Sequence, residues 1–129
     1  GFVILSGVIL GPAGVVAAMA GSALGDLLAG YPHYALFTAI IKGLMAFIAA
    51  KLILINERIS LRNVLTLILA FVWMVAAYFP ADVFFYGPEA AVASIPGNLT
   101  QAGVGFVISL SFLPFDRLLA RLRYRKRPM

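Results

Sequence analysis

One lysine within an apolar stretch is the side chain in this sequence best placed to bind a partner. Lys42 lies about seven positions into an apolar run that begins near Ala35, which is roughly 10 Å along a helix. At that depth in a membrane, a cationic side chain costs at least a few kcal/mol unless it pairs, reaches water or extends to the interface. Two interpretations stay open: Lys42 pairs with Asp26 alone, or the pair also lines a ligand cavity.

Two carboxamides lie one helical turn apart at the start of the last apolar segment. Asn98 and Gln101 share one helix face by the i, i+3 relation. Asn98 is a favoured residue for beginning a helix, whereas Gln101 brings amide donors and an amide acceptor into an apolar run. We expect Gln101 to bind a neutral polar ligand, and an interhelical hydrogen bond is the alternative.

Aromatic side chains gather at the same ends of the expected helices. Trp73 lies deeper than the interfacial tyrosines that mark membrane boundaries. With Tyr34 and Phe37, it is expected to form the apolar wall of a pocket for a flat ring. The candidate binding residues are therefore Asp26, Tyr34, Phe37, Lys42, Trp73, Asn98 and Gln101.

The sequence offers no catalytic or metal-binding motif. It contains no cysteine and one histidine, His33, and a lone histidine is a poor metal ligand. The motifs of zinc proteases, nucleophile elbows and phosphate-binding loops are missing. Acids within the apolar runs are too few for a proton relay. We predict that the chain is not an enzyme, uses no cofactor or metal, and relies on partner ATPases if its transport is energised.

The segments that position these residues are apolar throughout. Of the 129 residues, 63% are hydrophobic and 12% are charged, whereas a soluble domain carries about 25% charged residues. The mean hydropathy of +1.02 indicates that lipid surrounds the chain. Backbone groups in lipid are satisfied in helices or closed barrels, and barrel strands alternate apolar and polar residues, unlike these runs. The sequence predicts a single all-α domain, a polytopic transmembrane helical bundle.

Proline, glycine and polar residues divide the chain into segments. We expect a partial span at residues 2–10 and full spans at about 12–29, 35–55, 64–79 and 97–121, because a spanning helix needs about 20 apolar residues. Residues 80–96 are predicted to form an irregular external segment. Ala17, Gly21 and Gly25 lie four apart, a spacing that lets membrane helices pack closely. We expect this second segment to be central, packed either within the chain or against another subunit.

Basic residues fix the expected orientation. Every lysine and arginine except Lys42 lies near the end of the third segment, in the connection after it, or near the C-terminus, and basic residues mark the cytoplasmic side. The C-terminal cluster suits anionic lipid headgroups better than nucleic acid. We predict a multi-pass protein of a bacterial cytoplasmic membrane, with its C-terminus in the cytoplasm.

Several motifs, taken in order, resemble one membrane family. They are Gly11-Pro12-Ala13-Gly14, Gly25-Asp26-Leu27-Leu28, Tyr34-Ala35-Leu36-Phe37-Thr38, Ile41-Lys42-Gly43-Leu44 and the stretch from Ile95 to Gly105. The chain resembles the S components, the substrate-binding subunits of energy-coupling factor (ECF) vitamin transporters. The resemblance covers nearly the whole chain, from the family's second helix onward, so the first of six helices is expected to be missing from this sequence.

The resemblance implies a function and partners. An S component captures a water-soluble vitamin with high affinity and works with a transmembrane coupling subunit and two cytosolic ATPases. The Lys42-Gly43 pattern is similar to the branch for small pyrimidine or pyridine vitamins. We therefore expect hydroxymethylpyrimidine or pyridoxine as the ligand, ahead of riboflavin and pantothenate. A structural membrane subunit without transport function is the rival hypothesis.

Overall fold

The computed structural model describes residues 1–54, 59–115, 118 and 121, and these residues form helices and turns without a strand. The elements are α1 (Phe2–Leu10), α2 (Pro12–Leu28), α3 (Ala35–Leu52), α4 (Leu61–Tyr86), α5 (Pro88–Phe112) and a short 3-10 helix, η1 (Leu113–Phe115). The prediction of an all-α bundle is confirmed.

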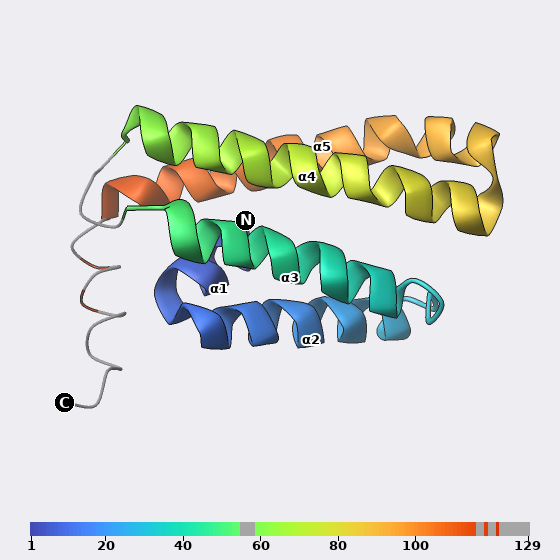
Figure 1. The fold of residues 1–129 in the computed structure, drawn as a ribbon, viewed down its shortest axis with the longest axis horizontal. Helices are drawn as coiled ribbons and strands as arrows, with labels where there is room; N and C mark the ends of the chain where they lie inside the picture. The colour runs from blue at the N-terminus through green and yellow to red at the C-terminus, as the bar shows by residue number, and fades with distance from the viewer. Residues whose placement is uncertain (55–58, 116–117, 119–120, 122–129) are drawn as a thin grey trace.

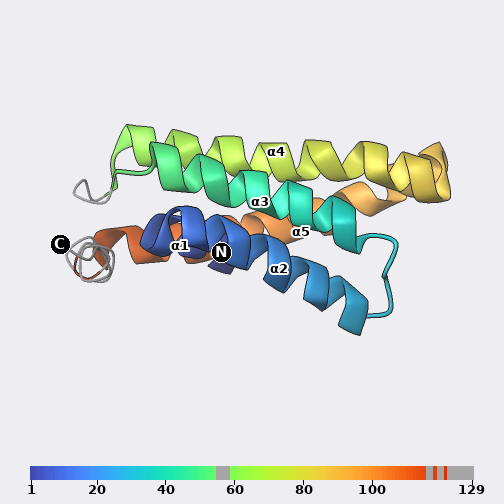
Figure 2. The same cartoon turned by 60° about the horizontal axis from the view of Figure 1, so that its bottom comes forward.

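The long helices form two antiparallel pairs that lie side by side (Figures 1 and 2). α2 packs along α3, α4 packs along α5, and the contact between α3 and α4 joins the two pairs. One end of the bundle carries the α2–α3 and α4–α5 turns; we name it the aromatic end, after His33, Phe85 and Tyr86. The opposite end, which carries Lys51 and Arg62, is the basic end.

α3 occupies the centre of the bundle, and the expectation that the small-residue segment is central is wrong. α3 contacts α1, α2 and α4, whereas the contacts of α2 within the described helices are with α1 and α3. A Cβ atom added at Gly21 or Gly25 would meet nothing within 4 Å. Small residues on this face of α2 therefore leave it open rather than tightly enclosed.

Two other glycines allow the helices of the first half to approach closely. A Cβ at Gly7 would lie 2.2 Å from the carbonyl oxygen of Ala46, and a Cβ at Gly14 would lie 1.8 Å from that of Ser6. Real side chains never come that close to a carbonyl, so any larger residue forces α1 away from α3 or from α2. The Ser6 hydroxyl, 3.1 Å from the Gly14 carbonyl oxygen, adds a hydrogen bond to this contact.

The second half of the chain is more regular than its prolines suggest. α4 continues through Pro80 to Tyr86, and α5 begins at Pro88 and continues through Pro96. Gly87, with φ at 89°, makes the whole connection, because glycine adopts this backbone region without strain. The predicted irregular segment at 80–96 is therefore wrong. Proline is tolerated inside membrane helices where neighbouring groups satisfy the freed carbonyls.

Long side chains from α1, α3 and α4 meet in the interior. Ile4, Met45, Leu67 and Met74 are the largest apolar side chains with almost no exposed surface. In lipid, dispersion forces and hydrogen bonds, rather than the hydrophobic effect, hold such contacts together. Replacing one of these residues by a smaller one would thus cost stability mainly through the cavity that remains.

Three of the described helices are long and apolar enough to cross a membrane: α3, α4, and the segment Pro88–Phe115 that combines α5 and η1. α2, with 17 residues, is apolar but shorter. Large apolar side chains point outward along these helices, such as Leu28 at 89% and Val72 at 59% exposure. Lipid is the solvent that suits this surface.

Candidate functional site

The half-buried Lys42 side chain is held by neutral groups in the middle of the bundle. Its Nζ lies 2.9 Å from Sδ of Met74 and 3.3 Å from Oε1 of Gln101. It also lies 5.5 Å from the centre of the Tyr78 ring, a distance at which the aromatic face attracts a cation. α3, α4 and α5 therefore all contribute to the surroundings of one ammonium group.

Asp26 does not pair directly with Lys42 in this arrangement. No ion pair of 4.0 Å or less joins the two side chains, which both lie in the described part of the chain, although the carboxylate still acts on the ammonium electrostatically. The Oδ2 atom of Asp26 is buried and has no hydrogen-bond partner. A buried carboxylate oxygen without a donor is costly, so this atom is the least satisfied polar group of the site.

Gln101 lies deeper than the sequence suggests. Because α5 begins at Pro88, Gln101 is about thirteen residues into the helix, or roughly 20 Å at 1.5 Å per residue. Asn98 therefore lies within α5 and not at its start. The alternative that it caps the helix is wrong. The interhelical bond considered for Gln101 exists, since Lys42 donates to it. Within the described residues, the Asn98 side chain makes no hydrogen bond.

The expected aromatic wall divides between two places. Phe37 and Trp73 line one open groove of about 360 Å³ on the surface of α3 and α4, together with Ile40, Ile41, Ala76, Ala77 and Pro80. The indole nitrogen of Trp73 donates to the Ile41 carbonyl oxygen over 3.2 Å. Neither Tyr34 nor Lys42 is among the lining residues, so the groove and the ammonium are separate features.

Tyr34 belongs to a polar contact that the sequence did not reveal. Its hydroxyl donates to Oδ1 of Asp82, and the Ser94 hydroxyl donates to Oδ2 of the same carboxylate. Asp82 is only 7% exposed, and each of its two carboxylate oxygens accepts a hydrogen bond from a neutral hydroxyl. Burial, and then the hydrogen bond to Asp82, raise the pKa of the Tyr34 phenol above its ordinary value, at which it is already a donor at physiological pH.

Around this contact, aromatic rings close the end of the bundle. His33 Nε2 and the Tyr86 hydroxyl are hydrogen-bonded at 2.8 Å. The rings of Tyr34 and Phe85 have centroids 4.9 Å apart, within the range favoured for aromatic pairs. The α2–α3 turn is thus attached to the last turn of α4. The only sequence signal for this cluster was the local density of tyrosine and phenylalanine.

Further into the bundle, Tyr78 connects this end with Lys42. Its ring lies beside the Lys42 ammonium, and its hydroxyl donates to Oγ1 of Thr38 over 3.3 Å. Thr38 is 5% exposed, so the hydrogen bond satisfies a buried hydroxyl. The candidate binding residues predicted from the sequence did not include Tyr78, Thr38 or Met74.

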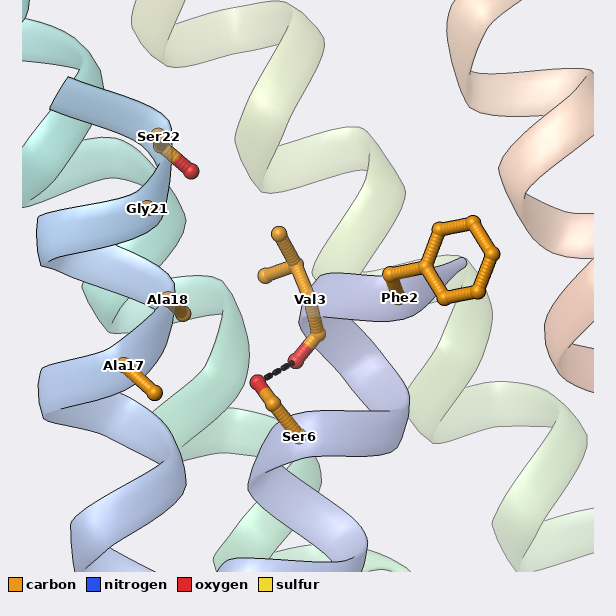
Figure 3. Close-up of a pocket in the computed structure, with 7 residues that line it drawn as sticks. All are labelled: Phe2, Val3, Ser6, Ala17, Ala18, Gly21 and Ser22. Atoms are coloured by element: carbon orange, nitrogen blue, oxygen red, sulfur yellow. Dashed lines mark hydrogen bonds between the residues drawn. The ribbon is translucent and has the colours of Figure 1, made fainter. Parts of the chain in front are cut away.

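A second hollow lies between α1 and α2, and Lys42 is not among its lining residues (Figure 3). It measures about 320 Å³ and is lined by Phe2, Val3, Ser6, Ala17, Ala18, Gly21 and Ser22. Its one marked polar contact joins the Ser6 hydroxyl to the Val3 carbonyl oxygen at 2.8 Å. With no charged lining residue, it lacks the chemistry to select a polar ligand. Among the described residues, no group of three or more His, Cys, Asp or Glu side chains gathers to hold a metal.

Comparisons with known proteins give one family. The model described as "ECF-type riboflavin transporter, S component" matches residues 1–118. A curated protein of Pyrococcus woesei is 36% identical over 107 residues, which are 82% of this chain and 71% of that protein. Its description reads "Uncharacterized protein in gap 3'region". No solved structure matches.

Proposed function

Because this chain belongs to the family of ECF-type riboflavin transporter S components, we propose that it binds riboflavin at the site around Lys42 and Gln101. As a member of that family it is a multi-pass membrane protein and a substrate-binding subunit of an ECF vitamin transporter. The choice of vitamin and the residues that hold it are the new elements of the proposal.

The main support for the proposed site is that the Lys42 ammonium directly contacts only neutral groups in the described part of the chain. Lys42 donates to Gln101 and Met74, and neither acceptor compensates a full charge in surroundings of low polarity. A side chain kept for structure would be expected beside a carboxylate. A ligand carbonyl or ring nitrogen that displaces Met74 or Gln101 would give Lys42 a stronger acceptor, and the freed carboxamide would hydrogen-bond the same ligand.

The ranking of vitamins rests on the family rather than on the Lys42-Gly43 pattern. That pattern favoured hydroxymethylpyrimidine or pyridoxine, whereas the family's description names riboflavin. We therefore place riboflavin first, the two smaller rings second and pantothenate last. All of them are water-soluble compounds that an S component would take up at the membrane surface.

The orientation and partners follow from the same proposal. With the basic end of the bundle in the cytoplasm, the aromatic end faces outward, and the ligand enters past His33 and Tyr86. The energy for transport comes from partner subunits of the ECF complex, which we take to be a transmembrane coupling subunit and two ATPases.

The rival is a structural membrane subunit in which Lys42 only offsets the charge of Asp26. The double variant Lys42→Met, Asp26→Leu separates the two hypotheses, because a structural pair can be removed together at little cost. We expect the purified double variant to stay folded and to lose vitamin binding in calorimetry. Unchanged riboflavin binding by this variant would support the rival.

A further inference from the structure

We infer that Asp26 accepts a hydrogen bond from an N–H of the vitamin while Lys42 donates to the carbonyl or ring nitrogen beside it. This inference rests on the proposed function and narrows its substrate class. The ligands it selects are uncharged rings with a donor next to an acceptor on one edge.

First, neither Asp26 nor Lys42 has an oppositely charged hydrogen-bond partner among the described residues. Oδ2 of Asp26 is buried without a donor, and Lys42 has two neutral acceptors in place of an anion. The two groups interact electrostatically but are not within ion-pair distance. They belong to α2 and α3, which pack against each other, and the inference is that both contact one small molecule.

The second step is the chemistry that such a pair selects. A carboxylate accepts and an ammonium donates, so a complementary ligand edge carries one donor and one acceptor side by side. Hydrogen bonds to charged groups are stronger than those between neutral groups. A ligand carboxylate could use Lys42 but would be repelled by Asp26, which disfavours pantothenate, biotin and folate.

The third step matches known rings to this edge. The imide of the riboflavin ring system has an N–H between two carbonyl groups. The amino group of hydroxymethylpyrimidine next to its ring nitrogen has the same order of donor and acceptor. Riboflavin adds a second carbonyl, which the freed carboxamide of Gln101 would bind, and therefore suits the three side chains best.

The direct test uses the unaltered protein and two ligands. Riboflavin and its N3-methyl analogue differ at the one N–H that Asp26 would accept, and calorimetry on the purified full chain measures both. We expect the methyl analogue to bind about 10- to 100-fold more weakly, as is typical for the loss of a hydrogen bond to a charged group. Equal affinities for the two compounds would overturn the inference.

A variant of Asp26 then tests whether this residue accepts the hydrogen bond from the N–H. Asp26→Asn should weaken riboflavin binding about 10-fold or more while leaving the already weak binding of the methyl analogue unchanged. Equal losses for both ligands would show that Asp26 acts only through the fold, and the inference would fail. The control is Glu89→Gln, an exposed acid in the first turn of α5, and thermal unfolding verifies that both variants are folded.

Binding measurements with several vitamins distinguish an error in the proposed function from an error in the role of Asp26. If the protein binds none of the vitamins, the proposed function itself is wrong. If it binds pantothenate or another carboxylate more tightly than riboflavin, the function stands and the assignment of Asp26 is wrong.

Discussion

The Nζ of Lys42 lies 3.3 Å from Oε1 of Gln101, and this contact links the middle of α3 to the middle of α5. It connects the two antiparallel helix pairs far from either end of the bundle. A polar ligand at this point would touch both pairs at once. The affinity for the vitamin should therefore respond to both side chains and little to their neighbours.

Replacing Gln101 tests the carboxamide separately. Gln101→Ala is expected to weaken riboflavin binding about 10-fold, the effect of losing one hydrogen bond in a site of low polarity. The matched control is Thr100→Val, because the Thr100 hydroxyl bonds only to the Pro96 carbonyl oxygen of its own helix. Titration calorimetry measures both variants, and a similar affinity for the two would remove Gln101 from the site.

Asp82 should be essential for stability rather than for binding. Asp82→Asn keeps the shape of the side chain but loses the charge that accepts from Tyr34 and Ser94. We expect a loss of about 1–3 kcal/mol in the free energy of unfolding, read as a lower thermal midpoint in detergent. Glu89→Gln, which removes an exposed acid near the same end, should leave the midpoint almost unchanged. Equal midpoints for the two variants would contradict the proposed contact.

The glycines of α1 and α2 should differ sharply in their tolerance of a methyl group. Gly7→Ala places a Cβ 2.2 Å from the Ala46 carbonyl oxygen and should destabilise the protein by about 1–3 kcal/mol, the usual cost of overpacking. Gly21→Ala meets nothing within 4 Å and should be neutral or stabilising by about 0.5–1 kcal/mol, because alanine favours helix. Thermal unfolding compares them, and the reverse order would show that α1 does not pack against α3 in this way.

The orientation can be tested with single cysteines, since the chain has none of its own. Glu89→Cys lies at the aromatic end, and Arg62→Cys lies at the basic end, both on exposed residues. We expect a membrane-impermeant maleimide to label Glu89→Cys in intact cells and Arg62→Cys only after permeabilisation, because basic residues mark the cytoplasmic side. The opposite labelling pattern would place the proposed ligand entrance inside the cell.

Continuous apolar runs were sufficient to predict helices and their number, but not the ends of α4 and α5. Pro80, Asp82 and Pro96 resembled loop residues because a proline removes a donor and a lone acid in lipid is expensive. α4 and α5 nevertheless continue through the two prolines. The buried Asp82 accepts hydrogen bonds from two hydroxyl groups, and a single sequence does not show such contacts.

For the candidate site, the sequence was enough to identify individual polar residues but not which residues they contact. Lys42 and Gln101 were each recognised from a polar group in an apolar run, and the structure brings them together. The sequence predicted Asp26 as the partner of Lys42, because opposite charges suggest an ion pair. Helix periodicity, however, does not show which neighbouring helix a given face contacts. Met74 and Tyr78, which contact the ammonium, have ordinary apolar surroundings in sequence and gave no signal.

The central claim is tested most directly by calorimetry of riboflavin binding to purified wild type, Lys42→Met and Lys51→Met. Lys51 is the matched control, since it is exposed near the basic end and rests on the Phe47 ring, 5.8 Å from its centre. The account predicts one tight site in wild type and in Lys51→Met, and binding about 10- to 100-fold weaker in Lys42→Met. Undiminished binding by Lys42→Met, in a variant that unfolds like wild type, would contradict it.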